Sequence, residues 1–388
     1  MVAYRPLWRG LTVAAALAAA ACGESSAPQQ PQLQNPQQLS SDMQTVSAVF
    51  ATPVFKSFGV IGTAVGSPVA STAPAGALLS AARVPAPPGP RPPYVDAAAR
   101  VRALQVAATA LTSSVSASVI PDTDLAKTFE WDVSTHQYVV GSDPGPSTGV
   151  RIILYAVDPI TEQIVESSLT PVGFVDLLDE SSGNTNQLHV IVQSGTPASP
   201  GATYVDYSIG ATVTPNDTGQ ASAFQATVPG YLSDGTRTLD FDASFSATNL
   251  DTDNPDAQID VTWDLDAPVV GVALHETFAT ANADQVTVTV DFSVARGGET
   301  VRLAGTVAAD LALDTQTADL TVYVNGQAFA RITGSATATT NDVRIVHADG
   351  TALSLDERLA VAGLFLLPDD IFDALDRLIS PAENLMGA

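Results

Sequence analysis

From Thr128 onward the chain alternates apolar and polar side chains, and this period of two constrains the fold more than any other feature. The clearest segment is 286–294, in which Val, Val, Val, Phe and Val alternate with Thr, Thr, Asp and Ser. Successive side chains of a strand point to opposite faces, so each such segment predicts a strand with one buried and one hydrated face. Similar segments lie at 239–245, 259–265, 301–307 and 320–324.

Turn residues separate these segments at intervals of about 10–20 residues. Asn325-Gly326 is the strongest hairpin signal, because this pair suits a tight turn with positive φ angles. About fourteen strands are expected, and open sheets of more than about ten strands curl or split. We therefore predict a mainly β (α+β) fold with a large curved antiparallel sheet, half-barrel or barrel-like, covered on one face by N-terminal and C-terminal helices.

The N-terminal cover is predicted from apolar residues at helical intervals. Residues 46–61 show this spacing, interrupted at Pro53, and predict two short helices. Residues 84–93 contain six prolines and predict a stiff spacer. Beyond them, residues 96–115 predict a longer helix with Asp96 as its N-cap.

Two further helices are predicted at the C-terminus. Ser354 and Glu357 have the spacing of a capping box and open an apolar helix that runs through Leu367. Pro368, followed by two aspartates, is typical of the first turn of a second helix. The apolar stripes of both helices are expected to pack on the sheet, as a plug packs over a half-barrel.

The charge of the chain limits its partners. The formal net charge is −25, with 45% hydrophobic and 15% charged residues, which is a globular composition with a strongly acidic balance. Such a body repels phosphates, so neither nucleic acid nor an anionic lipid surface bound through a basic patch is an expected partner. Scattered carboxylates that keep a large sheet soluble explain the charge more simply than a role in collecting cations.

The first 22 residues have the organisation of an export signal. Arg5 and Arg9 form a positive region, residues 11–21 are an uncharged apolar run, and the only cysteine, Cys22, follows three alanines. This pattern resembles the lipobox of bacterial lipoproteins, with Ala19 at the position where that family usually has Leu. The resemblance implies removal of residues 1–21 and attachment of palmitate-type acyl chains to Cys22, and hence membrane anchoring.

Two other interpretations of this segment fit less well. An apolar run of about eleven residues is too short to span a bilayer, which needs roughly twenty. An ordinary secreted signal would leave the single cysteine at this spacing without a role. Gly23 rather than Asp after the cysteine suggests, by the sorting rule of the family, the outer membrane of the cell envelope, on its periplasmic or its surface side.

These signals divide the chain into five segments. Residues 1–21 are the signal peptide, and residues 22–41 are the lipidated cysteine and a disordered tether rich in Gln, Pro and Ser. Residues 42–125 form the helical segment with its spacer, and residues 126–350 form the antiparallel β body. Residues 351–388 form the C-terminal helices.

No local motif for catalysis or for a cofactor is present in the sequence. The four histidines lie more than fifty residues apart, so no metal or triad spacing joins any two of them. His275-Glu276 is similar to the start of a zinc-protease helix, but Ala279 stands where the second histidine is needed, and the segment alternates like a strand. We expect no cofactor.

A weak candidate for a metal site is the segment that holds Asp251, Asp253 and Asp256. Oxygen ligands on alternate residues suit Ca²⁺, but the glycine and the final glutamate of a helical calcium loop are absent. A polar hairpin turn explains the same residues, because Asp and Asn favour turns for reasons of their own backbone.

Four aromatic residues are the candidates for a sugar or lipid site: Trp131, Tyr138, Tyr155 and Trp263. Alternation places Trp131 on one face with Val133, and Trp263 on one face with apolar neighbours, so core packing is the preferred interpretation.

Three functional hypotheses remain open. The first is an envelope lipoprotein, not an enzyme, with a binding or structural role that involves another envelope protein. The second is a carrier of an apolar or lipid ligand, as in envelope lipoproteins whose curved sheet and helices enclose a lipid. The third is a hydrolase whose Ser, Asp and His meet only in the folded chain.

Overall fold

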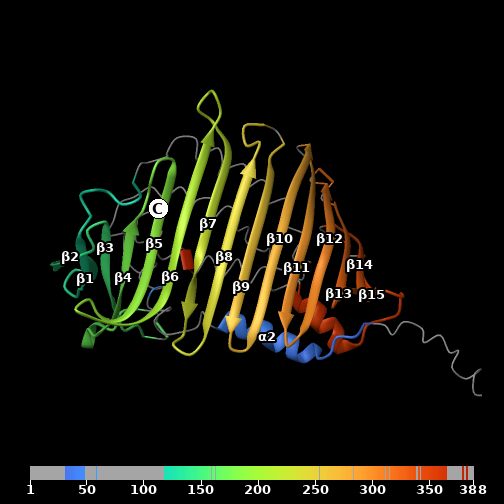
Figure 1. The fold of residues 1–388 in the computed structure, drawn as a ribbon, viewed down its shortest axis with the longest axis horizontal. Helices are drawn as coiled ribbons and strands as arrows, with labels where there is room; N and C mark the ends of the chain where they lie inside the picture. The colour runs from blue at the N-terminus through green and yellow to red at the C-terminus, as the bar shows by residue number, and fades with distance from the viewer. Residues whose placement is uncertain are drawn as a thin grey trace, which may run out of the picture.

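The computed structural model describes residues 31–48, 58, 118–364, 378, 379 and 382, except 159, 162, 253, 283, 311, 314, 338, 339 and 341 within the long range. Fifteen strands form a single sheet in these residues. From β3 to β15 each strand pairs with its neighbour in the chain, while β1 lies between β3 and β2, so that β2 and β15 are the two outer strands (Figure 1).

The strands alternate with short turns from Lys127 to His347. Their bounds are β1 (Lys127–Asp132), β2 (Gln137–Pro144), β3 (Gly149–Tyr155), β4 (Pro171–Asp179), β5 (Thr185–Thr196), β6 (Ser199–Pro215), β7 (Ala221–Ser233), β8 (Thr238–Thr248), β9 (Asp256–Asp266), β10 (Val269–Asn282), β11 (Gln285–Arg296), β12 (Glu299–Asp310), β13 (Thr315–Val324), β14 (Gln327–Thr337) and β15 (Arg344–His347). A short 3-10 helix, η3 (Glu166–Ser168), interrupts the connection between β3 and β4.

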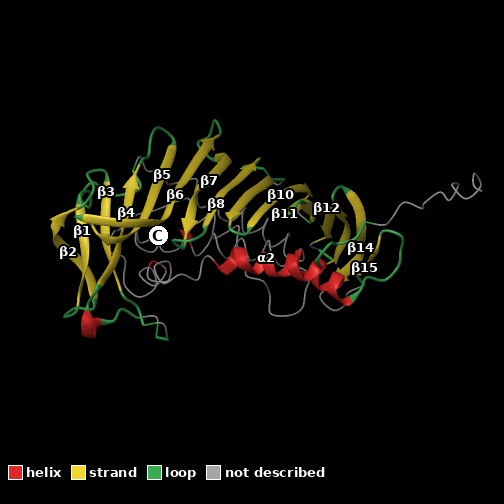
Figure 2. Cartoon of the chain, turned by 60° about the horizontal axis from the view of Figure 1, so that its bottom comes forward, coloured by secondary structure: helices red, strands yellow, loops and turns green. Residues whose placement is uncertain are grey.

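The pairing confirms the prediction of a mainly β fold with an antiparallel sheet. All neighbouring strands are antiparallel except β1 and β3, which run parallel over three residue pairs. The predicted hairpin at Asn325-Gly326 is present, and both residues have the positive φ angles, 50° and 79°, that such a turn requires. The sheet arches but stays open, so the barrel-like alternative is wrong (Figure 2).

The core lies on one face of the sheet. In β11 the apolar members of the alternating segment, from Val286 to Val294, are at most 1% exposed, and Trp263 of β9 is equally buried. Leu39, Val361 and Leu364 belong to the same continuous apolar core as these strand residues. The opposite face of the central strands is open to solvent, and we call it the open face.

The helix α2 (Pro36–Ala48) corrects the expected boundary of the tether, because residues 36–41 are helical. The helix begins where Asn35 accepts a hydrogen bond from the backbone of Gln38 (3.0 Å) and Pro36 supplies a first helical residue with no N–H to satisfy. Composition alone missed this start because Gln-rich sequence has few apolar residues. The other predicted N-terminal helices lie outside the described residues, apart from the buried, helical Phe58.

A second helix covers residues 355–364, and its start confirms the predicted capping box. The Ser354 backbone N–H donates to the Glu357 carboxylate (2.8 Å), and the Glu357 N–H donates to the Ser354 hydroxyl (3.3 Å). The predicted continuation to Leu367 and the helix after Pro368 lie outside the described residues. In the described part of the chain, no helix is long and apolar enough to cross a membrane.

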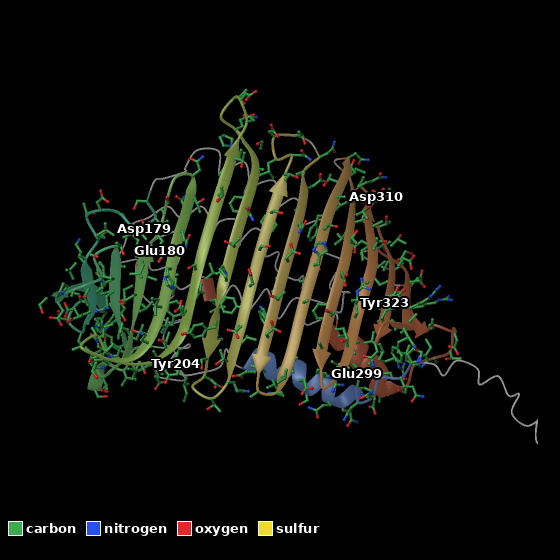
Figure 3. All side chains as sticks on the ribbon, in the orientation of Figure 1. Asp179, Glu180, Tyr204, Glu299, Asp310 and Tyr323 are labelled. Atoms are coloured by element: carbon green, nitrogen blue, oxygen red, sulfur yellow. The ribbon has the colours of Figure 1, made fainter. Side chains whose placement is uncertain are left out.

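A buried ionic cluster fixes the start of α2 to the β11–β12 hairpin. Arg296 is 3.0 Å from Glu299 and 3.6 Å from Asp42, and all three side chains are at most 10% exposed. Glu299 also accepts a hydrogen bond from the Gln34 backbone (2.8 Å), while Arg296 donates to the Asn35 carbonyl (2.8 Å). Figure 3 shows Glu299 at the end of the sheet along which α2 runs.

Candidate functional site

The first edge of the sheet, defined as β1, β2, β3 and residues 156–170, holds three of the four predicted aromatic residues. Trp131 of β1 and Tyr138 of β2 are cross-strand partners, and their rings meet edge to face at 5.4 Å. Glu166 of η3 accepts a hydrogen bond from the Trp131 indole (2.8 Å) and pairs with the His136 ring at 2.6 Å. The hydrogen bonds from His136 and Trp131 hold the pKa of the Glu166 carboxyl below its usual value.

Two tyrosines extend this cluster toward β3. The rings of Tyr138 and Tyr155 lie 6.5 Å apart, and the Tyr138 hydroxyl donates to the Ile153 carbonyl (2.9 Å). Burial raises the pKa of both phenols, so both stay neutral near pH 7. The arrangement is therefore a rigid support for the hairpin, with the polar atoms of its aromatic rings already bonded within the protein.

The structure thus unites three of the four aromatic candidates. Trp263 lies elsewhere, in the core under β9, as the core-packing interpretation predicted. Trp131 is only partly buried against the core, and Val133, which was expected beside it in the core, is 42% exposed. The reason is that the chain leaves the sheet at Asp132, where the carboxylate caps the hairpin turn by accepting from the Ser134 backbone (2.9 Å).

The edge strand β2 is exposed on both sides. Its two central valines, Val139 and Val140, point to opposite faces and are 40% and 54% exposed. Strand β3, on the other side of β1, is the reverse, because consecutive residues such as Ile152 and Ile153 are at most 9% exposed. A doubly covered strand therefore stands next to a hairpin that projects beyond the core.

The open face carries pairs of histidine and carboxylate. His275 of β10 is bonded through Nδ1 to Asp260, its cross-strand partner on β9. On its other side lies Asp291 of β11, which Arg302 binds through two hydrogen bonds of 2.6 and 2.7 Å. Those bonds from Arg302 lower the pKa of the Asp291 carboxyl.

A second pair lies nearer the first edge. His189 of β5 is 3.1 Å from Glu180 through Nδ1 and 2.7 Å from Asp206 through Nε2. Burial lowers the pKa of His189, but the hydrogen bonds with Asp206 and Glu180 outweigh burial, and the net shift is upward.

Each of the four histidines is in fact paired with a carboxylate, since His136 faces Glu166 and His347 lies 3.5 Å from Glu357. In the described residues the hydrogen bonds of the histidine rings go to carboxylates, and none goes to a serine hydroxyl. Sequence spacing missed these pairs because the partners meet through strand register and connecting loops. Only the exact pairing of β9 with β10 makes Asp260 a neighbour of His275.

The register also explains why the His275-Glu276 pair cannot act as a zinc-protease motif. The two residues follow each other in β10, so His275 points to the open face and Glu276, 1% exposed, points into the core.

The open face is strongly acidic at the centre of the sheet. Asp240 of β8 and Asp264 of β9 are direct cross-strand partners, a like-charge arrangement that costs stability. No cluster of three or more potential metal ligands occurs in the part of the chain that the structure describes.

Of the three calcium candidates, two can be placed. Asp251 accepts a hydrogen bond from Asn216 in the neighbouring turn (2.9 Å), and Asp256 accepts one from Asn249 (3.0 Å). Asp253 lies outside the described residues, as does Cys22, so the calcium site and the acylation site stay predictions. No protein-family model, curated protein or solved structure matches this chain.

Proposed function

We propose that this protein is a lipid-anchored lipoprotein of the bacterial cell envelope, with a non-enzymatic binding or structural role. The observation that carries the proposal is the asymmetry of the fifteen-stranded sheet. One face is a continuous apolar core, while the other is a wide polar surface whose histidines are bonded to carboxylates. Such a surface suits contact with another macromolecule better than it suits chemistry.

The position of α2 supports attachment to a membrane at one end of the body. The ionic cluster of Arg296, Glu299 and Asp42 fixes the first described residues to the β11–β12 hairpin. Thirteen residues, 23–35, separate Cys22 from Pro36, and the fourteen Cα-to-Cα steps between them, at about 3.5 Å each when extended, reach at most about 50 Å. An acylated Cys22 would therefore hold this hairpin, rather than the first edge, nearest to the membrane surface. We propose that this membrane is the outer membrane.

We also propose that helices from both ends of the chain cover the core face. The described apolar residues outside the strands support this, because Leu39, Phe58, Val361 and Ile379 share the core with the sheet. The Tyr207 hydroxyl of β6 donates to the Leu378 carbonyl, which ties the C-terminal segment to the buried side of the sheet.

Acylation is tested by expressing the full chain and its Cys22→Ser variant in bacteria with labelled palmitate. The proposal expects label and outer-membrane fractionation for the wild type, and loss of both in the variant. Ser25→Ala, which alters the tether but keeps the cysteine, is the matched control and should behave as wild type. Absence of label on the wild type, or membrane retention and normal maturation of Cys22→Ser, would contradict the anchor.

A second measurement distinguishes the proposed structural role from the carrier hypothesis. Native mass spectrometry of the purified full chain would show a co-purifying lipid if the protein carries an apolar ligand. The structural role proposed here expects the mass of the protein with its acyl chains alone.

A further inference from the structure

The helix at 355–364 is apolar on two opposite sides. Its inner side carries Val361 and Leu364, which are fully buried and belong to the continuous core under the sheet. Its outer side carries Leu355 and Leu359, which are 63% and 58% exposed. A helix that is apolar all round is normally covered all round, so the outer side is an apolar surface that the packing of the sheet does not explain.

The exposed leucines form a stripe rather than two scattered residues. Residues three or four apart are neighbours on the surface of a helix, so Leu355 and Leu359 share one face, and the exposed Ala362 continues it. Arg358 and Asp356, both exposed, stand at the two borders of this face. We call Leu355, Leu359 and Ala362 the outer stripe.

The outer stripe belongs to the end of the body from which the chain runs back to Cys22. The Gln37 side-chain amide of α2 lies 3.5 Å from the Asp356 carboxylate, so the two helices meet at their first turns. Figure 1 shows them at the same end of the sheet, with α2 in blue and helix 355–364 in red. The outer stripe therefore lies beside the start of the tether.

The tether is short compared with the body. Eleven Cα-to-Cα steps separate Cys22 from Leu33, the first buried residue of the described chain, and they span at most about 40 Å when extended. An acyl group on Cys22 keeps this end of the body within that distance of the lipid. Tethering raises the effective concentration of lipid at the stripe, so a contact too weak to bind a membrane alone becomes sufficient.

We infer that the outer stripe docks on the lipid surface in which Cys22 is anchored, so that the body rests on the membrane in one orientation. The inference rests on the proposed lipid anchor. Leu355 and Leu359 enter the boundary between headgroups and acyl chains, as the apolar face of an interfacial helix does. Arg358, at the border, extends its charged end toward a headgroup phosphate while its stem stays on the apolar side.

Charge favours a lipid surface over a second copy of the chain as the occupant. The formal net charge is −25, so two copies repel each other, whereas a zwitterionic bilayer has no net charge to repel the protein. The third charged residue of this turn, Glu357, is bonded to Ser354 and lies 3.5 Å from His347, away from the outer stripe.

The small size of the stripe points to the same occupant. A stable protein–protein interface takes roughly 800 Å² from each partner, and two leucines and an alanine on one helix provide only a small part of that area. A contact with lipid has no such minimum here, because the tether already holds the two surfaces together.

A fluorescent probe on the outer stripe tests the docking. Cys22 is the only cysteine, so in the acylated full chain Ala362→Cys supplies the only free thiol, and both leucines stay in place. The thiol is labelled with an environment-sensitive dye, and the protein is reconstituted into phosphatidylcholine vesicles with and without a nitroxide quencher at headgroup level. We expect the quencher to remove most of the dye fluorescence.

Leu313→Cys is the matched control for the probe. Leu313 is 70% exposed and lies in the β12–β13 turn, which the twelve residues of β12 separate from the β11–β12 hairpin by about 40 Å. A dye at this position should keep its fluorescence. Equal quenching at the two positions would overturn the inference.

A second measurement asks whether the leucines, rather than the dye, seek the lipid. Adding Leu355→Gln and Leu359→Gln to the Ala362→Cys chain should restore the dye fluorescence, because the polar amides disfavour the apolar boundary. Adding Leu313→Gln instead should leave the quenching unchanged. Quenching that survives loss of both leucines would overturn the inference. Circular dichroism of each variant shows that its fold is kept.

Flotation of each variant with the vesicles separates the anchor from the docking. A chain that does not float refutes the lipid anchor, and the docking with it. A chain that floats while the dye at position 362 stays unquenched refutes the docking alone. A dye signal that changes with protein concentration in detergent, without vesicles, would assign the stripe to a second copy and would also overturn the inference.

Discussion

The pattern of side-chain burial in strands β8–β12 differs from the pattern at the first edge. In the central strands every second side chain is buried under one face, as in β11, where Val288 and Val290 are at most 1% exposed and Thr289 between them is exposed. At the first edge the alternation fails: β3 buries both faces and β2 exposes both. Apolar burial specifies the centre, whereas individual hydrogen bonds specify the edge.

The difference matters because the two kinds of contact respond differently to change. Apolar burial is spread over many neighbours, so the centre is stable without any specific polar partner. When one partner of a buried polar contact is removed, the other partner stays buried without a hydrogen bond, and this costs free energy of desolvation. Substitutions that remove one kind of contact at a time separate the two regions.

The largest expected effect is the loss of a central aromatic side chain. Trp263→Ala should lower the free energy of unfolding by about 3–5 kcal/mol, because the ring is fully buried among the central strands. Trp131→Ala at the first edge should cost only about 1–2 kcal/mol, since its ring is half-buried and one hydrogen bond is lost. Urea unfolding measures both losses of stability. Equal losses would contradict the claim that apolar burial stabilises the centre more than the first edge.

A comparable loss of stability is expected where α2 contacts the β11–β12 hairpin. Arg296→Met should cost about 3–5 kcal/mol, because Glu299 and Asp42 would remain as buried, uncompensated carboxylates. Arg302→Met is the matched control on the adjoining strand, with a side chain that is 47% exposed, and should cost about 0–1 kcal/mol. Thermal and urea unfolding of the two variants should differ clearly, and similar values would mean that the cluster does not hold α2.

A smaller loss of stability is expected at the end of β4, where a single carboxylate binds the segment 118–120. Asp179 accepts hydrogen bonds from the backbones of Val119 (2.8 Å) and Ile120 (3.0 Å) and from the Ser118 hydroxyl. Asp179→Asn should cost about 1–3 kcal/mol. Asp158→Asn, at an exposed carboxylate with similar backbone bonds, should cost less.

The effect at Asp179 should depend on pH with a definite sign. Burial raises the pKa of Asp179, but the hydrogen bonds from Ile120 and Ser118 outweigh it, and the net pKa is lowered. A lowered pKa contributes stability above the unfolded value, near 4, and that contribution is lost as pH falls through the folded value. The difference between wild type and Asp179→Asn should therefore shrink in acid, and a difference that grows would contradict the assignment.

The smallest expected effect is a gain in stability rather than a loss. Asp264→Asn should raise the free energy of unfolding by about 0.2–1 kcal/mol, because it removes the like-charge pair with Asp240 across β8 and β9. The gain should fade at high salt, which screens charges on an open face. Asp319→Asn, on the open face of β13 opposite Thr306, is the control and should change little.

Sequence alone was sufficient for the centre and insufficient for the first edge. The alternation from Val286 to Val294 predicts both the strand and its buried face, because burial repeats with the period of the backbone. The contacts of Glu166 with Trp131 and His136 join a loop to a hairpin 30 or more residues away, and no local pattern encodes them. The capping box at Ser354 was predictable because its two residues are only three apart.

Hydrogen exchange measured by mass spectrometry tests most directly whether the sheet is one stable core with an open edge at β2. The account predicts slow exchange in β8–β12, where the alternate side chains are buried. Peptides that contain Val139 and Val140 should exchange quickly, because both side chains are exposed on an outer strand. Strong protection of β2, or exchange in β8–β12 as fast as in β2, would contradict the account.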